Sequence, residues 1–319
     1  MNVRLILLVA LLSVSAAAPA KKYETPMPLA QDLQVEVILN QQELGVDVPA
    51  TASSVGAQFG LLGALIGATI TAGQVANAEK RVAEIRNVLV DYRFNDNFER
   101  QLRAKLASEG ISPNPQFTFM ATPWDAYSAT KAGKLAADGV LIITPRYSIT
   151  NNFEVLKVSL NARFVNRKFK PNGKMKEKNL VMSWYSFQFP LTKLDGSYAT
   201  EDAQRWIDLG RQEMHGLLDQ GITQVVDMMV YEFSAEGRQA AKTKTKAKAK
   251  NTLLKGKPYW GWSLRETPDW IWLREWGVLG ITGYYPVDGL TKAAGTASPV
   301  AASAAADSAT PATDADSSQ

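Results

Sequence analysis

The spacing of apolar positions along the chain predicts four helices. Two segments, 78–92 and 94–110, place an apolar residue every three to four positions, as amphipathic helices do. A third helix over 123–139 opens at Pro123 and closes at Gly139. A long fourth helix, roughly 200–233, keeps one face apolar. The apolar positions of that face are Ile207, Gly210, Met214, Leu218, Gly221, Val225 and Met229.

Other segments alternate between apolar and polar residues, which is typical of strands that are buried on one side. A tight turn at Asn151-Asn152 joins two of them, and a longer loop over 168–178 precedes the last. The strand segments are 31–39, 116–121, 140–150, 153–166 and 180–189. The element order predicts an α+β fold, with a mostly antiparallel sheet of about four to five strands packed against helices.

The composition changes sharply at several points, and these changes divide the chain into segments. A glycine-zipper helix precedes the core, a small Trp-rich β appendage follows it, and the last residues are too poor in apolar side chains to fold. The expected segments are a signal peptide (1–20), an N-terminal strand and linker (21–54), a glycine-rich apolar helical segment (55–77), the α/β core (78–233), a Lys-rich linker (234–257), a Trp-rich β hairpin or meander (258–287) and a disordered Ala/Ser/Thr tail (288–319).

The first 20 residues have the layout of a secretory signal peptide. Arg4 precedes an apolar run from Leu5 to Leu12, and Ala18-Pro19-Ala20 fits the cleavage rule. The chain contains no cysteine, which excludes a lipid anchor on cysteine, disulfides and thiolate metal sites. We therefore expect export across the inner membrane to the periplasm, in a soluble or membrane-associated form, and not as a lipoprotein.

Residues 91–193 resemble a known type of envelope domain. A helix leads to a strand, a second helix ends near Ala137-Asp138, and strands such as VLIITPRYSIT follow. In this order the segment is similar to the small α/β domain of TolB N-terminal regions and of the curli-secretion lipoprotein. The resemblance implies an accessory or assembly role in the bacterial envelope, and it brings no catalytic residues.

The stretch GAQFGLLGALIGATITAG contains four glycines at helical spacing. At 100° per residue, Gly56, Gly60, Gly63 and Gly67 fall within an arc of about 60° on one helix face. Each interior glycine costs about 1 kcal/mol relative to alanine. Such a cost is retained where another surface approaches the backbone closely, so we interpret the stretch as a glycine zipper.

Three interpretations of this stretch remain open. Its strongly apolar part would reach about 24 Å as a helix, which is shorter than the roughly 30 Å hydrocarbon core of a bilayer. A buried helix or helical hairpin against the protein's own core is therefore favoured. Self-association or insertion at a membrane is the second interpretation, and an irregular glycine-rich loop is the third.

Two further segments, one rich in lysine and one rich in tryptophan, are candidate binding surfaces. Arg238–Lys257 carries eight Lys or Arg residues and no acid, within a chain of net charge +4. We expect a solvated linker there, and anionic headgroups are an alternative partner. The Trp-rich segment places Trp260 with Trp262, and Trp270 with Trp272, at alternating positions of a hairpin around the turn RETPD. These tryptophans either pack on the core or form a ligand or membrane-interface platform.

Catalytic chemistry finds little support in the sequence. His215 is the only histidine, and we expect it to be a structural residue at the edge of an apolar face. Ser128 and Lys131 form an S-x-x-K pattern, but no K-T-G element follows it. No phosphate-binding glycine loop is present, lysines without interleaved aromatic residues do not suggest nucleic-acid binding, and no cofactor is expected.

The sequence therefore favours a non-enzymatic accessory or scaffolding protein of the bacterial envelope. It would associate with itself, with an envelope protein or with the membrane through the glycine zipper. The alternative is a protein that binds or hydrolyses cell-wall glycan with the Trp-rich segment.

Overall fold

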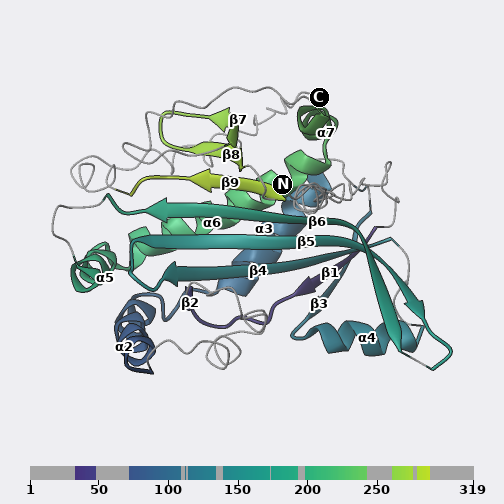
Figure 1. The fold of residues 1–319 in the computed structure, drawn as a ribbon, viewed down its shortest axis with the longest axis horizontal. Helices are drawn as coiled ribbons and strands as arrows, with labels where there is room; N and C mark the ends of the chain where they lie inside the picture. Colours follow the sequence, from purple (N-terminus) through teal and green to yellow (C-terminus); the bar gives the residue numbers. More distant parts are fainter. Residues whose placement is uncertain are drawn as a thin grey trace, which may run out of the picture.

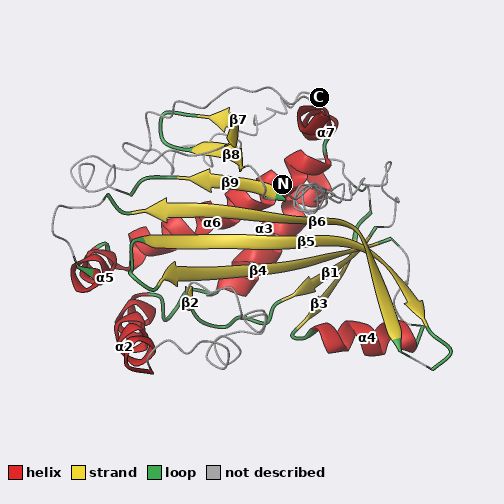
Figure 2. Cartoon of the chain, in the orientation of Figure 1, coloured by secondary structure: helices red, strands yellow, loops and turns green. Residues whose placement is uncertain are grey.

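The computed structural model describes residues 33–47, 72–108, 112, 114–133, 139–172, 174–192, 198–242, 261–275 and 279–287. Its main feature is a mixed nine-stranded sheet with helices around it (Figures 1 and 2). The strand order is β3-β1-β4-β5-β6-β9-β8-β7, and β2 pairs with the end of β4. The predicted α+β class is confirmed, and the sheet is larger than expected.

Parallel pairs and antiparallel pairs alternate across the sheet in blocks. Strand β1 lies parallel between β3 and β4, whereas β4, β5 and β6 form an antiparallel meander. Strand β9 pairs parallel with β6, and β8 and β7 then continue antiparallel to the far edge. The strands are β1 (Gln34–Ile38), β2 (Gly45–Asp47), β3 (Gln116–Met120), β4 (Val140–Thr150), β5 (Val155–Phe169), β6 (Met175–Pro190), β7 (Gly261–Glu266), β8 (Ile271–Glu275) and β9 (Gly280–Tyr284).

One face of the sheet packs against helices and forms the main core. Helix α6 crosses behind β5 and β6, with α3 packed beside it (Figure 1). Alternate residues of β5, such as Leu156, Val158 and Leu160, face this layer and are fully buried. The helices are α2 (Ala72–Val88), α3 (Phe94–Ser108), α4 (Pro123–Lys131), α5 (Ala199–Asp208), α6 (Gly210–Phe233) and α7 (Ala235–Lys242).

Two of the expected helices differ from the structure at glycines with positive φ. The long helix over 200–233 is broken into α5 and α6 at Gly210, whose φ of +74° lies in the left-handed region. The helix expected to close at Gly139 ends at Lys131, and Gly133 follows with a φ of +70°. Glycine adopts such angles without the steric penalty that other residues meet, which makes it a common point for a helix to end.

The loop expected over 168–178 is in fact the tip of a long hairpin. Strand β5 runs to Phe169 and β6 starts at Met175, so these two residues face each other across a tight turn. The amide of Lys170 donates to the carbonyl of Lys174 and closes the turn at 2.9 Å. The many lysines here concealed the strand pattern, since alternation is hard to see when both faces are polar.

The Trp-rich strands extend the main sheet and do not form a separate appendage. Strand β9 pairs with β6 from Trp184–Gly280 to Gln188–Tyr284. At Gly280, whose φ is +136°, an added Cβ would lie 1.7 Å from the carbonyl oxygen of Trp184. Only glycine allows this close backbone approach, and it lets β9 begin directly beside β6.

The expected linker over 234–257 begins as helix α7. The Ser234 hydroxyl accepts a hydrogen bond from the amide of Gly237, which caps the helix start. The expected helical segment 55–77 overlaps α2, which begins at Ala72, and residues 55–71 lie outside the described residues. Among the described helices, none is both long and apolar enough to cross a membrane.

Candidate functional site

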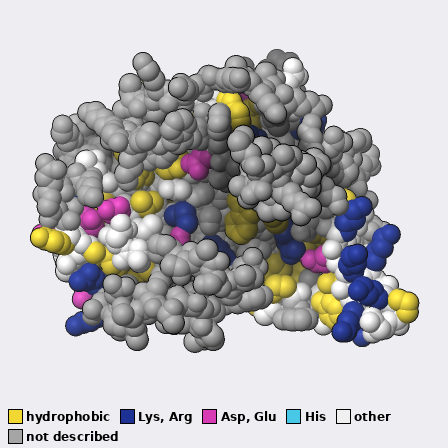
Figure 3. Space-filling model, viewed as in Figure 1, with side chains coloured by type: hydrophobic (Ala, Val, Ile, Leu, Met, Phe, Trp, Pro, Cys, Tyr) yellow, Lys and Arg dark blue, Asp and Glu magenta, His cyan; other side chains and the backbone are white. Residues whose placement is uncertain are grey.

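The sheet face opposite α3 and α6 carries polar side chains on its central strands, and we call it the polar face. It looks toward the viewer in Figure 1, and Figure 3 shows the molecule from the same side. The face arises from the alternation of β4, β5 and β6, whose other residues enter the core. Its polar members on these strands include Thr144, Arg146, Lys157, Ser159, Asn161, Arg163, Arg167, Glu177, Ser186 and Gln188.

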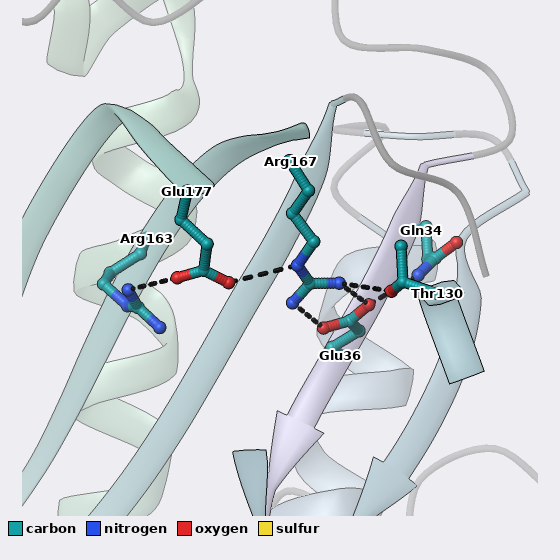
Figure 4. Close-up of polar contacts among 6 residues, drawn as sticks. All are labelled: Gln34, Glu36, Thr130, Arg163, Arg167 and Glu177. Atoms are coloured by element: carbon teal, nitrogen blue, oxygen red, sulfur yellow. Dashed lines mark hydrogen bonds and ion pairs between the residues drawn. The ribbon is translucent and has the colours of Figure 1, made fainter. Parts of the chain in front are cut away.

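One end of the polar face holds a chain of four alternating charges (Figure 4). Arg167 of β5 donates from both terminal nitrogens to the two carboxylate oxygens of Glu36 on β1, each at 2.6 Å. Its Nε donates to Glu177 of β6 at 3.1 Å, and Arg163 donates to the other oxygen of Glu177 at 3.1 Å. Thr130 of α4 accepts a further bond from Arg167. The chain thus joins three strands and one helix.

The Glu36–Arg167 pair is buried almost completely, with 0% and 2% of the side chains exposed. Burial by itself lowers the pKa of the Arg167 guanidinium, but hydrogen bonds and charges from Glu36 and Glu177 outweigh burial and raise the pKa. The pair is bidentate, which is the strongest geometry for arginine with a carboxylate. All these oxygens have partners, so we interpret the chain as a structural brace and not as a catalytic group.

The middle of the polar face has unpaired polar atoms beside an exposed tryptophan. The Nδ2 atom of Asn161 and the hydroxyl of Ser186 are buried and have no hydrogen-bond partner among the described residues. Asn161 lies opposite Trp184 in the β5–β6 register, and Ser186 is two residues further along β6. Trp184 is 42% exposed, an unusual state for so large an apolar side chain. This group could bind a ligand that offers hydrogen bonds and an apolar surface.

A second polar group lies on the core side of β6, where the Tyr185 hydroxyl donates to Glu232 of α6 at 2.6 Å. Burial, together with the charge of Glu232, raises the pKa of Tyr185 well above its usual value. Arg274 of β8 donates to the other oxygen of Glu232 at 3.0 Å. These bonds fasten the Trp-rich strands to α6, which is a structural role.

His215 lies at the boundary of the apolar face of α6, as expected from the sequence. Its ring packs against Tyr92 with 4.9 Å between centroids, and Tyr92 in turn donates to Asp219 at 2.7 Å. Burial and the charge of Arg211 lower the pKa of His215, which favours the neutral ring. No serine or threonine hydroxyl bonds to the ring among the described residues, so nothing there forms a nucleophile–base pair.

The structure describes three of the four expected tryptophans, and their surroundings differ. Trp272 is 1% exposed and its indole nitrogen donates to Gln224 of α6 at 2.6 Å, so it is a core residue and cannot serve a ligand platform. Trp270 is partly buried and packs on Trp272, with centroids 5.4 Å apart. Trp262 is half-buried on β7, and Trp260 lies outside the described residues.

None of the other expected positions supplies a site within the described part of the chain. The glycine-zipper residues Gly56, Gly60, Gly63 and Gly67 lie outside the described residues. Ser128 and Lys131 of the S-x-x-K pattern are exposed on α4, and no hydrogen bond joins their side chains to each other in the described structure. The described residues also contain no group of three His, Cys, Asp or Glu side chains that could hold a metal ion.

The sequence did not reveal the charge chain, because its members come from segments far apart in the chain. Glu36 and Arg167 are separated by 131 residues. A glutamate between two valines of a buried strand was nevertheless a signal, since a buried carboxylate requires a partner.

Comparisons with known proteins add little. No family model matches the chain, and no curated protein matches it. One solved structure, described as "Crystal structure of uncharacterized protein", is similar over 66% of this chain and 97% of that chain, at 15% identity and a TM-score of 0.20. A likeness at this TM-score carries no argument about the fold or the function.

Proposed function

We propose that the protein is a non-enzymatic accessory or scaffolding component of the bacterial cell envelope, and that it binds its partner through the polar face. The signal-like first 20 residues and the resemblance of residues 91–193 to TolB N-terminal and curli-secretion domains support the envelope setting. Self-association through Gly56, Gly60, Gly63 and Gly67 remains a prediction within this proposal.

The observation that carries the proposal is the placement of Trp184, Asn161 and Ser186 together on central strands of the sheet. A buried polar atom without a hydrogen bond costs about 1–3 kcal/mol. Both atoms are shielded from solvent, so a partner that supplies hydrogen bonds to them must displace the atoms that cover them, and it then recovers this energy. Tryptophan is also among the residues that contribute most at protein interfaces.

Site-specific cross-linking tests this proposal. A photoreactive amino acid replaces Trp184 in the full chain expressed in its host, and the same amino acid at Tyr198 is the control, since Tyr198 is 72% exposed on a different part of the surface. We expect the chain in the envelope fraction and an adduct of discrete mass from position 184 alone. The adduct should disappear when Asn161→Leu and Ser186→Val are added. Recovery in the cytoplasm, or identical adducts from both positions, contradicts the proposal.

A glycan ligand is the second candidate, and the exposed ring of Trp184 beside an amide and a hydroxyl favours it. Sugar rings pack on aromatic faces while their hydroxyls bond to such polar groups. Sedimentation with purified peptidoglycan distinguishes the candidates. Binding that is lost in Trp184→Ala but retained in Trp270→Ala supports the glycan. Absence of binding by the unmodified chain removes this candidate and leaves the scaffold.

A further inference from the structure

The hairpin of β5 and β6 extends beyond the helical layer as a two-stranded arm. We call residues 166–172 and 174–178 the basic arm. It carries five lysines, Lys168, Lys170, Lys174, Lys176 and Lys178, and all five are exposed. Figure 3 shows Lys and Arg side chains gathered at the lower right of the view, where Figure 1 places the end of this hairpin beside α4.

The two faces of the arm differ in chemistry. Arg167 and Glu177 lie opposite each other on the face toward α4, where they belong to the buried charge chain. Lys168 and Lys176 lie opposite each other on the other face, and Lys178 follows on the same side. Among the described residues, no carboxylate lies within ion-pair distance of any arm lysine. Within the described part of the chain, the lysine face is therefore a concentrated positive surface without a paired carboxylate.

Opposed like charges across a strand pair destabilise it, so this arrangement has a cost in the free protein. Lysines on strand edges do discourage edge-to-edge aggregation. Either sign of charge would prevent such aggregation, however. The exposed positions of the arm carry positive charge only, at Lys168, Lys170, Lys174, Lys176 and Lys178. A uniform sign is what an anionic partner requires.

The structure also holds the arm in one orientation. Its base is braced by the Glu36–Arg167–Glu177 chain (Figure 4). Near its tip, the ring of Phe169 packs edge-on against Tyr127 of α4, with 6.2 Å between centroids. Phe169 is still 39% exposed, and it lies on the face of the arm toward α4, opposite to the face that carries Lys168 and Lys176.

We propose that the basic arm binds the surface of an anionic phospholipid bilayer. Lysine is a compact point charge without the forked geometry with which arginine recognises individual phosphates, and five lysines suit a diffuse field of headgroup charge. Nucleic acid is less suitable, since the arm has one aromatic ring and that ring already packs on Tyr127.

Vesicle sedimentation with the full chain tests this proposal. The lipid is phosphatidylglycerol mixed with phosphatidylethanolamine, and phosphatidylcholine vesicles serve as the neutral reference. The arm variant combines Lys168→Gln, Lys176→Gln and Lys178→Gln. Each lysine near an anionic surface contributes roughly fivefold, so the partition coefficient should fall on the order of a hundredfold. Binding of the unmodified chain should weaken strongly in high salt.

Two control variants remove the same number of charges elsewhere. Lys80→Gln, Arg93→Gln and Arg100→Gln change exposed positions on α2, the loop after it and α3. A second control changes Lys244, Lys246 and Lys248 to Gln, because residues 238–257 form the other lysine-rich segment. The proposal expects both controls to retain most of the vesicle binding. A loss in either control that equals the loss in the arm variant overturns it.

A single-site probe locates the contact directly. The chain has no cysteine, so Asn172→Cys introduces the only thiol at the arm tip, and Thr200→Cys on α5 does so near the opposite end of the strands. An environment-sensitive fluorophore should shift to shorter wavelength on addition of anionic vesicles at position 172 and not at 200. An unchanged spectrum at 172, or tighter binding to a DNA duplex than to the vesicles, contradicts the proposal. Neither readout depends on Trp184, so the proposed function can fail independently.

Discussion

The buried charge chain leads to a quantitative prediction for Glu36→Gln. The substitution keeps the shape of the side chain but removes the charge that lies 2.6 Å from each terminal nitrogen of Arg167. Arg167, which is 2% exposed, would then depend on Glu177 alone for charge compensation. Removing one partner of a buried pair typically costs about 3–5 kcal/mol, because the remaining charge cannot regain water. We expect about 3 kcal/mol, the low end, since Glu177 remains.

Two comparison variants separate loss of charge compensation from loss of packing. Glu36→Met combined with Arg167→Met removes both charges and fills similar volume, so we expect a cost within about 1 kcal/mol. Glu177→Gln should cost about 1 kcal/mol, because the Glu177 side chain is 25% exposed and water can replace it. The essential prediction is that Glu36→Gln destabilises the protein more than either the double variant or Glu177→Gln does.

The free energy of unfolding is measured by urea titration with far-UV circular dichroism and tryptophan fluorescence, and coincident transitions justify a two-state fit. A cost below about 1 kcal/mol for Glu36→Gln would refute the argument that the pair is desolvated. The double variant provides an independent check. If it is as unstable as the single variant, the side chains matter for packing and not for charge.

Three further predictions follow from local geometry. Gly221→Ala should lower the free energy of unfolding by about 1–3 kcal/mol in urea titrations, because its Cβ would lie 2.5 Å from a methyl carbon of Val158. Gly216→Ala on the same helix meets no atom within 4 Å and should stabilise the protein by up to about 1 kcal/mol. Gly280→Ala should cost at least about 2 kcal/mol and loosen β9, seen as faster amide hydrogen exchange in residues 280–284, since its φ and the β6 backbone both exclude a Cβ. Burial raises the pKa of Tyr147 to about 12, so the unfolded chain loses this proton first and stability should fall as pH rises from about 10 to 12. Tyr147→Phe should flatten that decline in urea titrations at alkaline pH, and an equal decline in both proteins would refute the assignment.

Much of the fold could be predicted because its signals are local. The helix over Phe94–Ser108 buries Phe98, Leu102 and Leu106, which the spacing of apolar residues had indicated. The antiparallel order of β4, β5 and β6 likewise follows from alternation and the turn at Asn151-Asn152, whereas the far end of the β5–β6 hairpin was expected to be a loop. The parallel pairing of β9 with β6 could not be predicted, because it joins strands almost 100 residues apart through a backbone approach that depends on Gly280.

The candidate site was harder to predict than the fold, for a physical reason. Sequence reasoning treated the tryptophans of residues 258–287 as the group to consider, since they are dense there. The number of tryptophans in a segment, however, does not indicate whether their side chains face the core or the solvent. Trp272 points into the core, whereas Trp184, surrounded by ordinary strand residues, stands half-exposed beside unpaired polar atoms. Only the register of β5 against β6 reveals that neighbourhood.

The charge chain lies between the two proposed binding surfaces, the polar face and the basic arm. Arg163 lies next to the middle of the polar face, two residues from Asn161, and Arg167 lies at the base of the basic arm. Both bind Glu177, so the carboxylate joins the two strands of the hairpin at the point where one surface ends and the other begins. A hydrophobic pair could fill the same space, but it would not define one orientation of the arm, because apolar contacts lack direction. We therefore infer that the buried ion pair at this junction holds the arm of like charges in one orientation.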